Sequence, residues 1–235
     1  MKTLTHWKAF FKFLKNPTYI EEEQGVKNKA LLTINSFILK ILIILAILIL
    51  FGVYVYFNGQ METVEDMKGM GSNLDGLYPP LLVFTLVAVF EELSFRLLLT
   101  KFKPLFFAIS IAGMLAYYVK KITFKNMFWE PEGLWQTFAI ALPVFVVSYL
   151  IARRYQESLS NFWEQHFSKI FYVSAFLFAF MHFFNSPDWN LAYLKTNISQ
   201  LFSGLFFGFI RIRSGLIYAI VAHFLWNFMV SSIGA

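Results

Sequence analysis

Residues 89–96 of the 235-residue chain read VFEELSFR, a charged stretch inside a strongly apolar segment. The stretch places Glu91, Glu92 and Arg96 within an apolar run that extends from residue 77 to residue 99. Such a run is long enough to cross a bilayer, where an ionisable side chain costs several kcal/mol unless it is paired or faces a polar cavity. These charges therefore indicate a site inside a membrane protein, and other segments must supply their partners.

The composition of the chain is that of a membrane protein. It is 58% hydrophobic, 20% aromatic and 14% charged, whereas a soluble domain is about a quarter charged. We expect an all-α fold: a polytopic helical integral membrane protein with about seven (six to eight) transmembrane helices around a polar intramembrane cavity. The chain has no Cys, which excludes disulfides, thiolate metal sites and cysteine nucleophiles. Its formal net charge of +6 is typical of basic cytoplasmic loops and does not indicate nucleic-acid binding.

The first 30 residues differ from the rest. Lysines alternate with aromatic and aliphatic residues up to Asn16 and Pro17, a pattern that predicts a basic amphipathic helix on the cytoplasmic membrane surface. No apolar core with a cleavage site follows, so the pattern is not that of a signal peptide. We therefore divide the chain into an interfacial segment, 1–30, and a transmembrane domain, 31–235.

Hydropathy predicts the positions of the spans. Lys40 in the first span is expected to snorkel to the headgroups, and Pro143 to kink the fourth. Gly204 and Gly208 have the spacing that lets two helices approach closely. We expect loops at 58–77 and 120–133 and a turn at 185–188. The predicted spans are 37–57, 78–100, 104–119, 134–152, 169–184, 196–210 and 216–233.

The distribution of basic residues predicts the orientation. With the N-terminus in the cytoplasm, most Lys and Arg residues fall on cytoplasmic segments, as the positive-inside rule requires. This predicts a multi-pass protein of the plasma or inner membrane with a cytoplasmic N-terminus. Lys120, Lys121 and Lys125 lie on the opposite side and disagree with it. An even number of spans follows if a neighbouring span is misread.

Four polar side chains fall at similar depths. At 1.5 Å per residue, Glu91 lies about 15 Å from Lys101, and His223 lies about 15 Å from the basic turn that precedes its span. His182 and Asn227 come out at about 20 and 21 Å by the same reckoning. The cost of burying such groups in lipid favours one shared interior cavity.

The neighbouring carboxylates are expected to have different roles. Glu92 and Arg96 are four residues apart on a helix and can form an ion pair. Glu91 is rotated by about 100° and faces elsewhere. Alone, either histidine is more simply a structural hydrogen-bonding group, and Asn227 is an ordinary interhelical one. Their combination favours one structural pair and one reactive carboxylate.

The order of these motifs resembles the CPBP family, the CAAX-protease and bacteriocin-processing intramembrane proteases. The similarity lies in EELSFR at 91–96, FAFMH at 178–182 and HFLWN at 223–227, with GLFFG and RIRSGL preceding the last. It covers about residues 78–233. The resemblance implies peptide-bond hydrolysis within the membrane by a glutamate-activated water.

The resemblance also implies roles for individual residues. Glu91 is the expected base, His182 holds the water, and His223 and Asn227 donate to the oxyanion. The supporting residues are Glu92, Arg96 and Phe178. No cofactor is certain, because Glu91, His182 and His223 also suit a catalytic zinc with an open position. We expect metal-free activation, with zinc as the alternative.

Several functions remain open on the sequence alone. The first is an endopeptidase acting on hydrophobic or lipidated peptides, with membrane lipid as its surroundings; the substrate and the oligomeric state are not indicated. The second is a non-enzymatic immunity or regulatory protein of the same fold that binds a peptide or membrane partner. A proton-coupled transporter ranks last, because its typical internal repeat is absent from the sequence.

Overall fold

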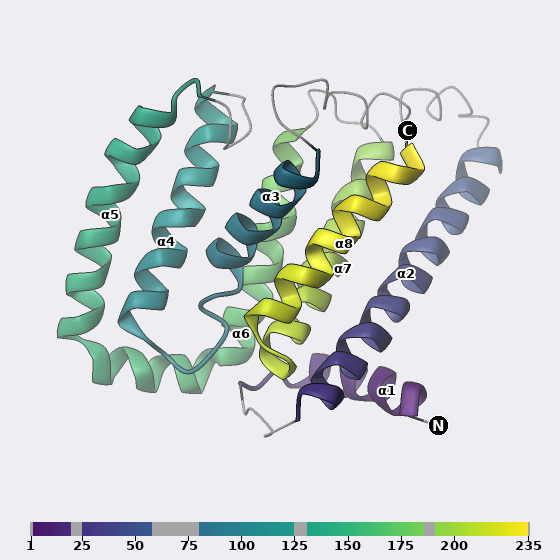
Figure 1. The fold of residues 1–235 in the computed structure, drawn as a ribbon, viewed down its shortest axis with the longest axis horizontal. Helices are drawn as coiled ribbons and strands as arrows, with labels where there is room; N and C mark the ends of the chain where they lie inside the picture. Colours follow the sequence, from purple (N-terminus) through teal and green to yellow (C-terminus); the bar gives the residue numbers. More distant parts are fainter. Residues whose placement is uncertain (1, 20–24, 58–79, 125–130, 186–190, 235) are drawn as a thin grey trace.

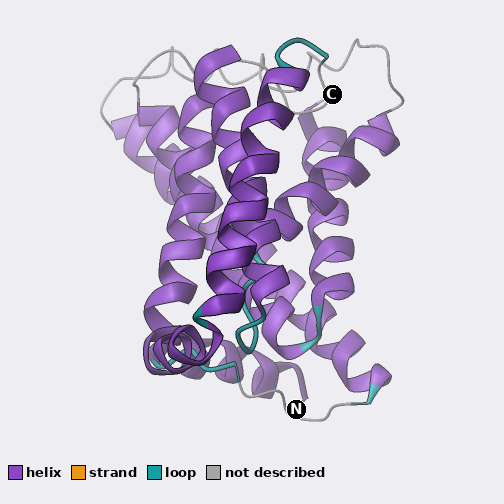
Figure 2. Cartoon of the chain, turned by 90° about the vertical axis from the view of Figure 1, so that its left-hand side faces the viewer, coloured by secondary structure: helices purple, strands orange, loops and turns teal. Residues whose placement is uncertain are grey.

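The computed structural model describes residues 2–19, 25–57, 80–124, 131–185 and 191–234, and these form helices and turns without a strand. The long helices run side by side as a bundle, and α1 lies across one end of it (Figure 1, Figure 2). The predicted all-α fold is confirmed. In chain order the elements are α1 (Lys2–Lys15), α2 (Val26–Phe57), α3 (Pro80–Phe95), α4 (Pro104–Val119), η2 (Lys120–Phe124), α5 (Leu134–Arg154), α6 (Gln156–His182), η3 (Phe183–Asn185), α7 (Leu191–Arg213) and α8 (Leu216–Gly234).

The outer helices have the surface of a membrane protein. Within the described residues, 3 helices are long and apolar enough to cross a membrane: α2, α4 continued by η2, and α5. The helix α8 is apolar but shorter. Large aliphatic side chains are exposed along α2 and α5, for example Leu50 at 69% and Leu142 at 64%. Such continuous apolar surface is stable against lipid rather than water, and the chain is an integral membrane protein.

Several predicted boundaries differ from the structure. α2 begins at Val26, well before residue 37, and α3 ends at Phe95 instead of residue 100. α3 ends there because the backbone N–H groups of Arg96 and Leu97 both donate to the Glu92 carbonyl, at 2.9 and 3.0 Å. The predicted loop at 120–133 is wrong for residues 120–124, which continue α4 as the π-helical turn η2. The predicted loop at 58–77 and most of the turn at 185–188 lie outside the described residues.

The helix α6 has two parts. It bends at His166, whose φ of −115° and ψ of 15° are not helical. The part before the bend lies across the same end of the bundle as α1, and the part after it runs along the bundle (Figure 1). The sequence predicted only the second part, since the first is polar.

Glycines bring α7 close to the second part of α6. A Cβ on Gly204 would lie 2.9 Å from the Ala175 carbonyl oxygen, and one on Gly208 would lie 2.8 Å from the Phe171 ring. Both distances are too short for any larger side chain to fit without movement. The close approach predicted from their spacing is confirmed, with α6 as the partner helix.

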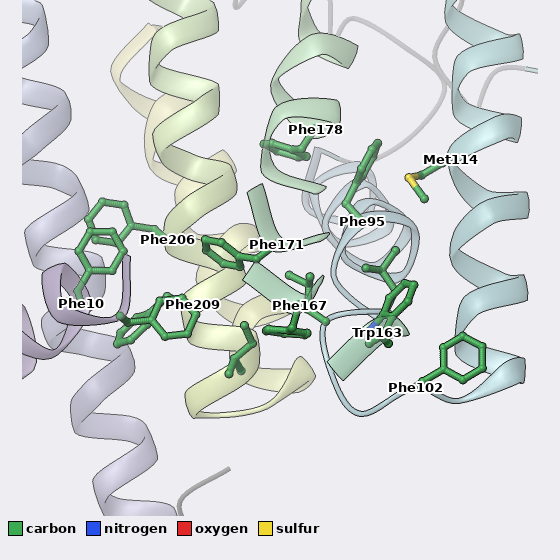
Figure 3. Close-up of a cluster of buried hydrophobic side chains, with 14 of the residues drawn as sticks. Phe10, Phe95, Phe102, Met114, Trp163, Phe167, Phe171, Phe178, Phe206 and Phe209 are labelled. Atoms are coloured by element: carbon green, nitrogen blue, oxygen red, sulfur yellow. The ribbon is translucent and has the colours of Figure 1, made fainter. Parts of the chain in front are cut away.

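The N-terminal helix packs into the bundle. Its predicted range, up to Asn16, is confirmed. However, Phe10 and Phe13 are buried, and the Phe10 ring stacks on Phe206 of α7 with centroids 4.0 Å apart (Figure 3). The apolar side of α1 is therefore buried against the bundle, and the interfacial placement of this segment stays a prediction. Phe11 alone among these rings stays half exposed.

Candidate active site

The two adjacent carboxylates lie in the last turn of α3. The side chains of Glu91 and Glu92 are 2% and 0% exposed. Burial of two ionisable groups is costly unless each finds charged or hydrogen-bonding partners. The neighbouring helices supply those partners, and they differ for the two residues.

His223 of α8 lies between the carboxylates. Its Nδ1 is 2.9 Å from Glu92 Oε1, and its Nε2 is 3.5 Å from Glu91 Oε2. The imidazole is 3% exposed and stacks on Phe207 of α7, with centroids 4.6 Å apart. The shared depth predicted for Glu91 and His223 is thus seen as direct proximity. The contact with Glu92 was not predicted, because Glu92 was assigned only to Arg96.

Tyr117 of α4 holds the other oxygen of Glu91. Its hydroxyl donates to Glu91 Oε1 at 2.5 Å, and both groups are buried. The remaining oxygen, Glu91 Oε2, is buried and has no hydrogen-bond partner among the described residues. A base needs such an oxygen, because it must accept a proton from a group that arrives with the substrate. Sequence reasoning missed Tyr117, since only charged, His and Asn side chains were compared by depth.

A close contact between α3 and α4 sets the position of Tyr117. A Cβ on Gly113 would lie 2.6 Å from Ser94 Oγ, and Ser110 donates to the Leu93 carbonyl at 3.1 Å. Both contacts lie on the side of α4 that faces the carboxylates. The small residue at 113 therefore allows the approach that places the Tyr117 hydroxyl against Glu91.

Arg96 lies directly after α3 and is fully buried. Its Nη1 is 3.4 Å from Glu92 Oε1, so the predicted pair is present. Its Cζ lies 3.7 Å from the centroid of the Phe178 ring, a cation–π contact that is strongest where water is excluded. Phe178, predicted as a supporting residue from its motif, thus packs the face of its ring against the guanidinium.

His182 lies one turn beyond Phe178 on α6 and is partly buried. Its Nδ1 is 2.9 Å from the Phe178 carbonyl oxygen. Because a carbonyl only accepts, Nδ1 donates, and in the neutral ring Nε2 is the acceptor. The ring is within electrostatic range of Glu91 and His223. The structure therefore brings His182 to the same cluster.

Asn227 of α8 is half-buried, one turn beyond His223. Within the described part of the chain, no hydrogen bond joins its side chain to the carboxylates or to either histidine. It shares the helix and the approximate depth of the cluster, as predicted, without contacting it.

Lys40 of α2 is a further member that the sequence reasoning placed wrongly. It was expected to snorkel to the headgroups, but it is 0% exposed. Its Nζ lies 3.4 Å from the Trp226 ring centroid and 4.1 Å from that of Phe207, within electrostatic range of Arg96 and Glu92. Reckoned from Lys29, its depth is about 16 Å. The same depth argument would have grouped it with Glu91.

The donor set does not fit the zinc alternative. The described residues contain no group of His, Asp or Glu side chains arranged to hold a metal ion. Both nitrogens of His223 already face carboxylate oxygens, and Glu91 Oε1 accepts from Tyr117. A three-ligand zinc site needs His nitrogens that point at a common centre, so we derive no step through a metal.

The fold and this cluster define a class: a polytopic helical membrane protein with a buried Glu–His site. A family model described as type II CAAX prenyl endopeptidase Rce1-like matches residues 73–229. The chain belongs to this family, as the resemblance of its motifs predicted, and is thus a membrane protein of a protease family. No curated protein and no solved structure matches the chain significantly. The matched range contains Glu91, His182 and His223, whereas α1 and α2 precede it.

Proposed function

We propose that this protein is an intramembrane endopeptidase in which Glu91 activates the water that hydrolyses a peptide bond. One observation carries the proposal: Glu91 Oε2 is buried and without a hydrogen-bond partner, 3.5 Å from His223 Nε2, while Tyr117 holds Oε1. The carboxylate is fixed at one oxygen and available at the other. The family match supports the class of reaction, and the apolar surroundings suit a hydrophobic or lipidated peptide.

The base and the water work as follows. A water bound to Glu91 Oε2 gives that oxygen a proton as the water oxygen attacks the carbonyl carbon. His182 Nε2 accepts a hydrogen bond from the second O–H of the water, which stays on the acyl product, and so orients the attacking lone pair. The proton on Glu91 then passes to the amide nitrogen as the C–N bond breaks, leaving a carboxylic acid and an amine. General-base catalysis of this kind contributes about 10²–10⁴-fold.

His223 and Asn227 stabilise the oxyanion. Doubly protonated His223 donates Nδ1–H to Glu92 and Nε2–H to the developing negative charge. The Asn227 amide, one turn away on the same helix, supplies the second donor. Fixed donors in a site without water are among the largest catalytic contributions.

The test compares Glu91→Gln with wild type. The purified protein in detergent is given a fluorogenic peptide with a prenylated cysteine near its C-terminus, and the cleavage site is read by mass spectrometry. We expect Glu91→Gln to lower the rate by at least about 10²-fold. The control is Glu157→Gln, an exposed carboxylate on the first part of α6, which should leave the rate unchanged.

Two outcomes would overturn the proposal. Equal cleavage rates for Glu91→Gln and wild type would show that Glu91 is not the base. If wild type cleaves neither hydrophobic nor prenylated peptides, the result would favour a non-enzymatic protein that binds a peptide or membrane partner. Loss of the rate with a chelator and its recovery with zinc would overturn the metal-free mechanism alone.

The orientation is a separate proposal: the end of the bundle that carries α1 faces the cytoplasm, in the plasma or inner membrane. The last turns of α1, α5 and α7 are basic, with Lys12, Lys15, Arg153, Arg154, Arg211 and Arg213, and these turns lie at this end (Figure 1). The chain has no Cys, so single cysteines can be labelled selectively. In intact cells, an impermeant maleimide should label Ser232→Cys and spare Lys12→Cys; the reverse pattern would invert the orientation.

A further inference from the structure

A cavity lies between α4 and α6, apart from the carboxylates. Its volume is about 450 Å³, within the usual range of small-molecule sites. Its walls are almost wholly apolar side chains, among them Leu98, Phe107, Met114 and Leu177. Met114 of α4 and Trp163 of α6, which both line it, are labelled in Figure 3. Neither Glu91 nor His223 lines it, so the proposed chemistry does not use it.

Basic side chains surround one end of the cavity. His166 and Lys169, at the bend of α6, line it directly. An adjoining hollow shares Leu98, Phe107 and Trp163 with it and is lined by Lys101 and Lys103. The three lysines are exposed. The acidic residue of this turn, Glu164, is exposed and within electrostatic range of Tyr19. An apolar cavity with a cationic rim is complementary to a long-chain anion.

Trp163 adds an unused hydrogen-bond donor at the same place. Its side chain is 7% exposed and lines both the cavity and the hollow. Its Nε1 is buried and has no hydrogen-bond partner among the described residues. A buried donor without an acceptor is unfavourable, and indole N–H groups at membrane interfaces commonly find one in the headgroup region. An acceptor from outside the chain fits this position.

We propose that this cavity binds one acyl chain of an anionic glycerophospholipid from the leaflet at the α1 end. The phosphate lies among Lys101, Lys103 and Lys169, and an ester or phosphate oxygen accepts from Trp163 Nε1. From Lys169 to Leu177 the cavity wall rises about 12 Å, which is close to the apolar depth of one leaflet. The basic rim favours the acyl chain of a phospholipid over the lipid anchor of a peptide substrate, because that anchor carries no phosphate.

The same wall supports the site described above. Ser174, which lines the cavity, donates its hydroxyl to the carbonyl of Phe95, at the end of α3. The Leu177 carbonyl accepts from Tyr118 at 3.1 Å, one residue from the tyrosine that holds Glu91. A chain that fills the cavity therefore stabilises the packing behind the carboxylates without touching them.

The experiment measures lipid binding by the purified full-length protein and needs no cleavage. Native mass spectrometry counts phosphatidylglycerol and phosphatidylcholine of equal chain length retained by wild type, Lys169→Gln, Trp163→Phe and Val173→Trp. The matched control is Lys12→Gln, an exposed lysine of α1 that does not line the cavity. We expect wild type to prefer phosphatidylglycerol, Lys169→Gln to lose about fivefold in affinity and Trp163→Phe about threefold. Val173→Trp, which fills the cavity, should lose the tight site.

Two kinds of result would overturn the proposal. Equal retention of both lipids, or equal losses of affinity in Lys169→Gln and Lys12→Gln, would show that the basic rim does not distinguish anionic lipid. Displacement of the lipid by a prenylated peptide, unchanged in Lys169→Gln, would assign the cavity to the substrate anchor instead. Because these readouts are binding affinities, they stay separate from a failure of the proposed cleavage.

Discussion

Glu91 and Glu92 are neighbours in sequence, equally buried, and differently surrounded. Glu92 collects positive charge: Arg96 at 3.4 Å, His223 Nδ1 at 2.9 Å, and Lys40 within electrostatic range. Glu91 accepts a hydrogen bond from the neutral Tyr117 and has His223 Nε2 at 3.5 Å, while its Oε2 has no hydrogen-bond partner in the described structure. The helix rotation between consecutive residues is enough to give two neighbouring carboxylates different partners.

The largest expected effect separates these two residues by stability. Glu92→Gln leaves Arg96 buried without its counter-ion, so the free energy of unfolding should fall by about 3–5 kcal/mol. Glu91→Gln neutralises a carboxylate that lies farther from Arg96 in the pairing, since the ion pair printed for Arg96 is with Glu92 at 3.4 Å, and it should change the free energy of unfolding far less. Chemical denaturation in detergent micelles measures both. Equal losses would mean that the two carboxylates share one structural role.

The second effect concerns the phenol on Glu91. Tyr117→Phe removes the hydrogen bond to Oε1, and hydrogen bonds to charged groups are worth about 1.5–3 kcal/mol. We expect kcat/KM to fall by about 10–100-fold, with kcat carrying the loss, because the base is no longer held in place. Peptide cleavage under single-turnover conditions is the measurement. As a control, Tyr118→Phe should have a smaller effect, since Tyr118 donates to a backbone carbonyl instead.

The smallest effect is at Lys40. Lys40→Met keeps the length of the side chain and removes a cation whose described contacts are the Trp226 and Phe207 rings. A desolvated cation–π contact is worth about 2 kcal/mol, which burial of the charge partly offsets. The free energy of unfolding should fall by no more than about that amount in the same denaturation assay. A loss as large as that of Glu92→Gln would place Lys40 inside the ion-pair network.

The sequence predicted the membrane fold, the family and the depth of the polar residues, because burial in lipid penalises every unpaired charge. Glu91 and His223 could be matched by counting residues along their helices. Lateral neighbours could not be found this way: Tyr117 is neutral, and its contact depends on the approach of α4 that Gly113 allows. Lys40 was misjudged because a lysine near a span end usually snorkels, whereas here α2 starts well before the predicted boundary.

The bend of α6 is the second feature that hydropathy could not reveal. Its first part is polar on the exposed side and lies across the end of the bundle, with Trp163 and Phe167 buried beneath it. The hydropathy averaged over a window of such a helix is similar to that of a polar loop. Only the tertiary packing of those aromatic side chains makes it a helix, and that packing depends on α4 and on the N-terminal residues.

The burial of Phe10 against Phe206 has a consequence for biosynthesis. α1 precedes α7 in the chain, yet the ring on which it stacks belongs to α7. During synthesis α1 therefore emerges before its partner helix exists, and its packing must follow the insertion of α7. Contacts between the two ends of a chain form late in folding. Docking of α1 against the bundle is thus a late step of assembly.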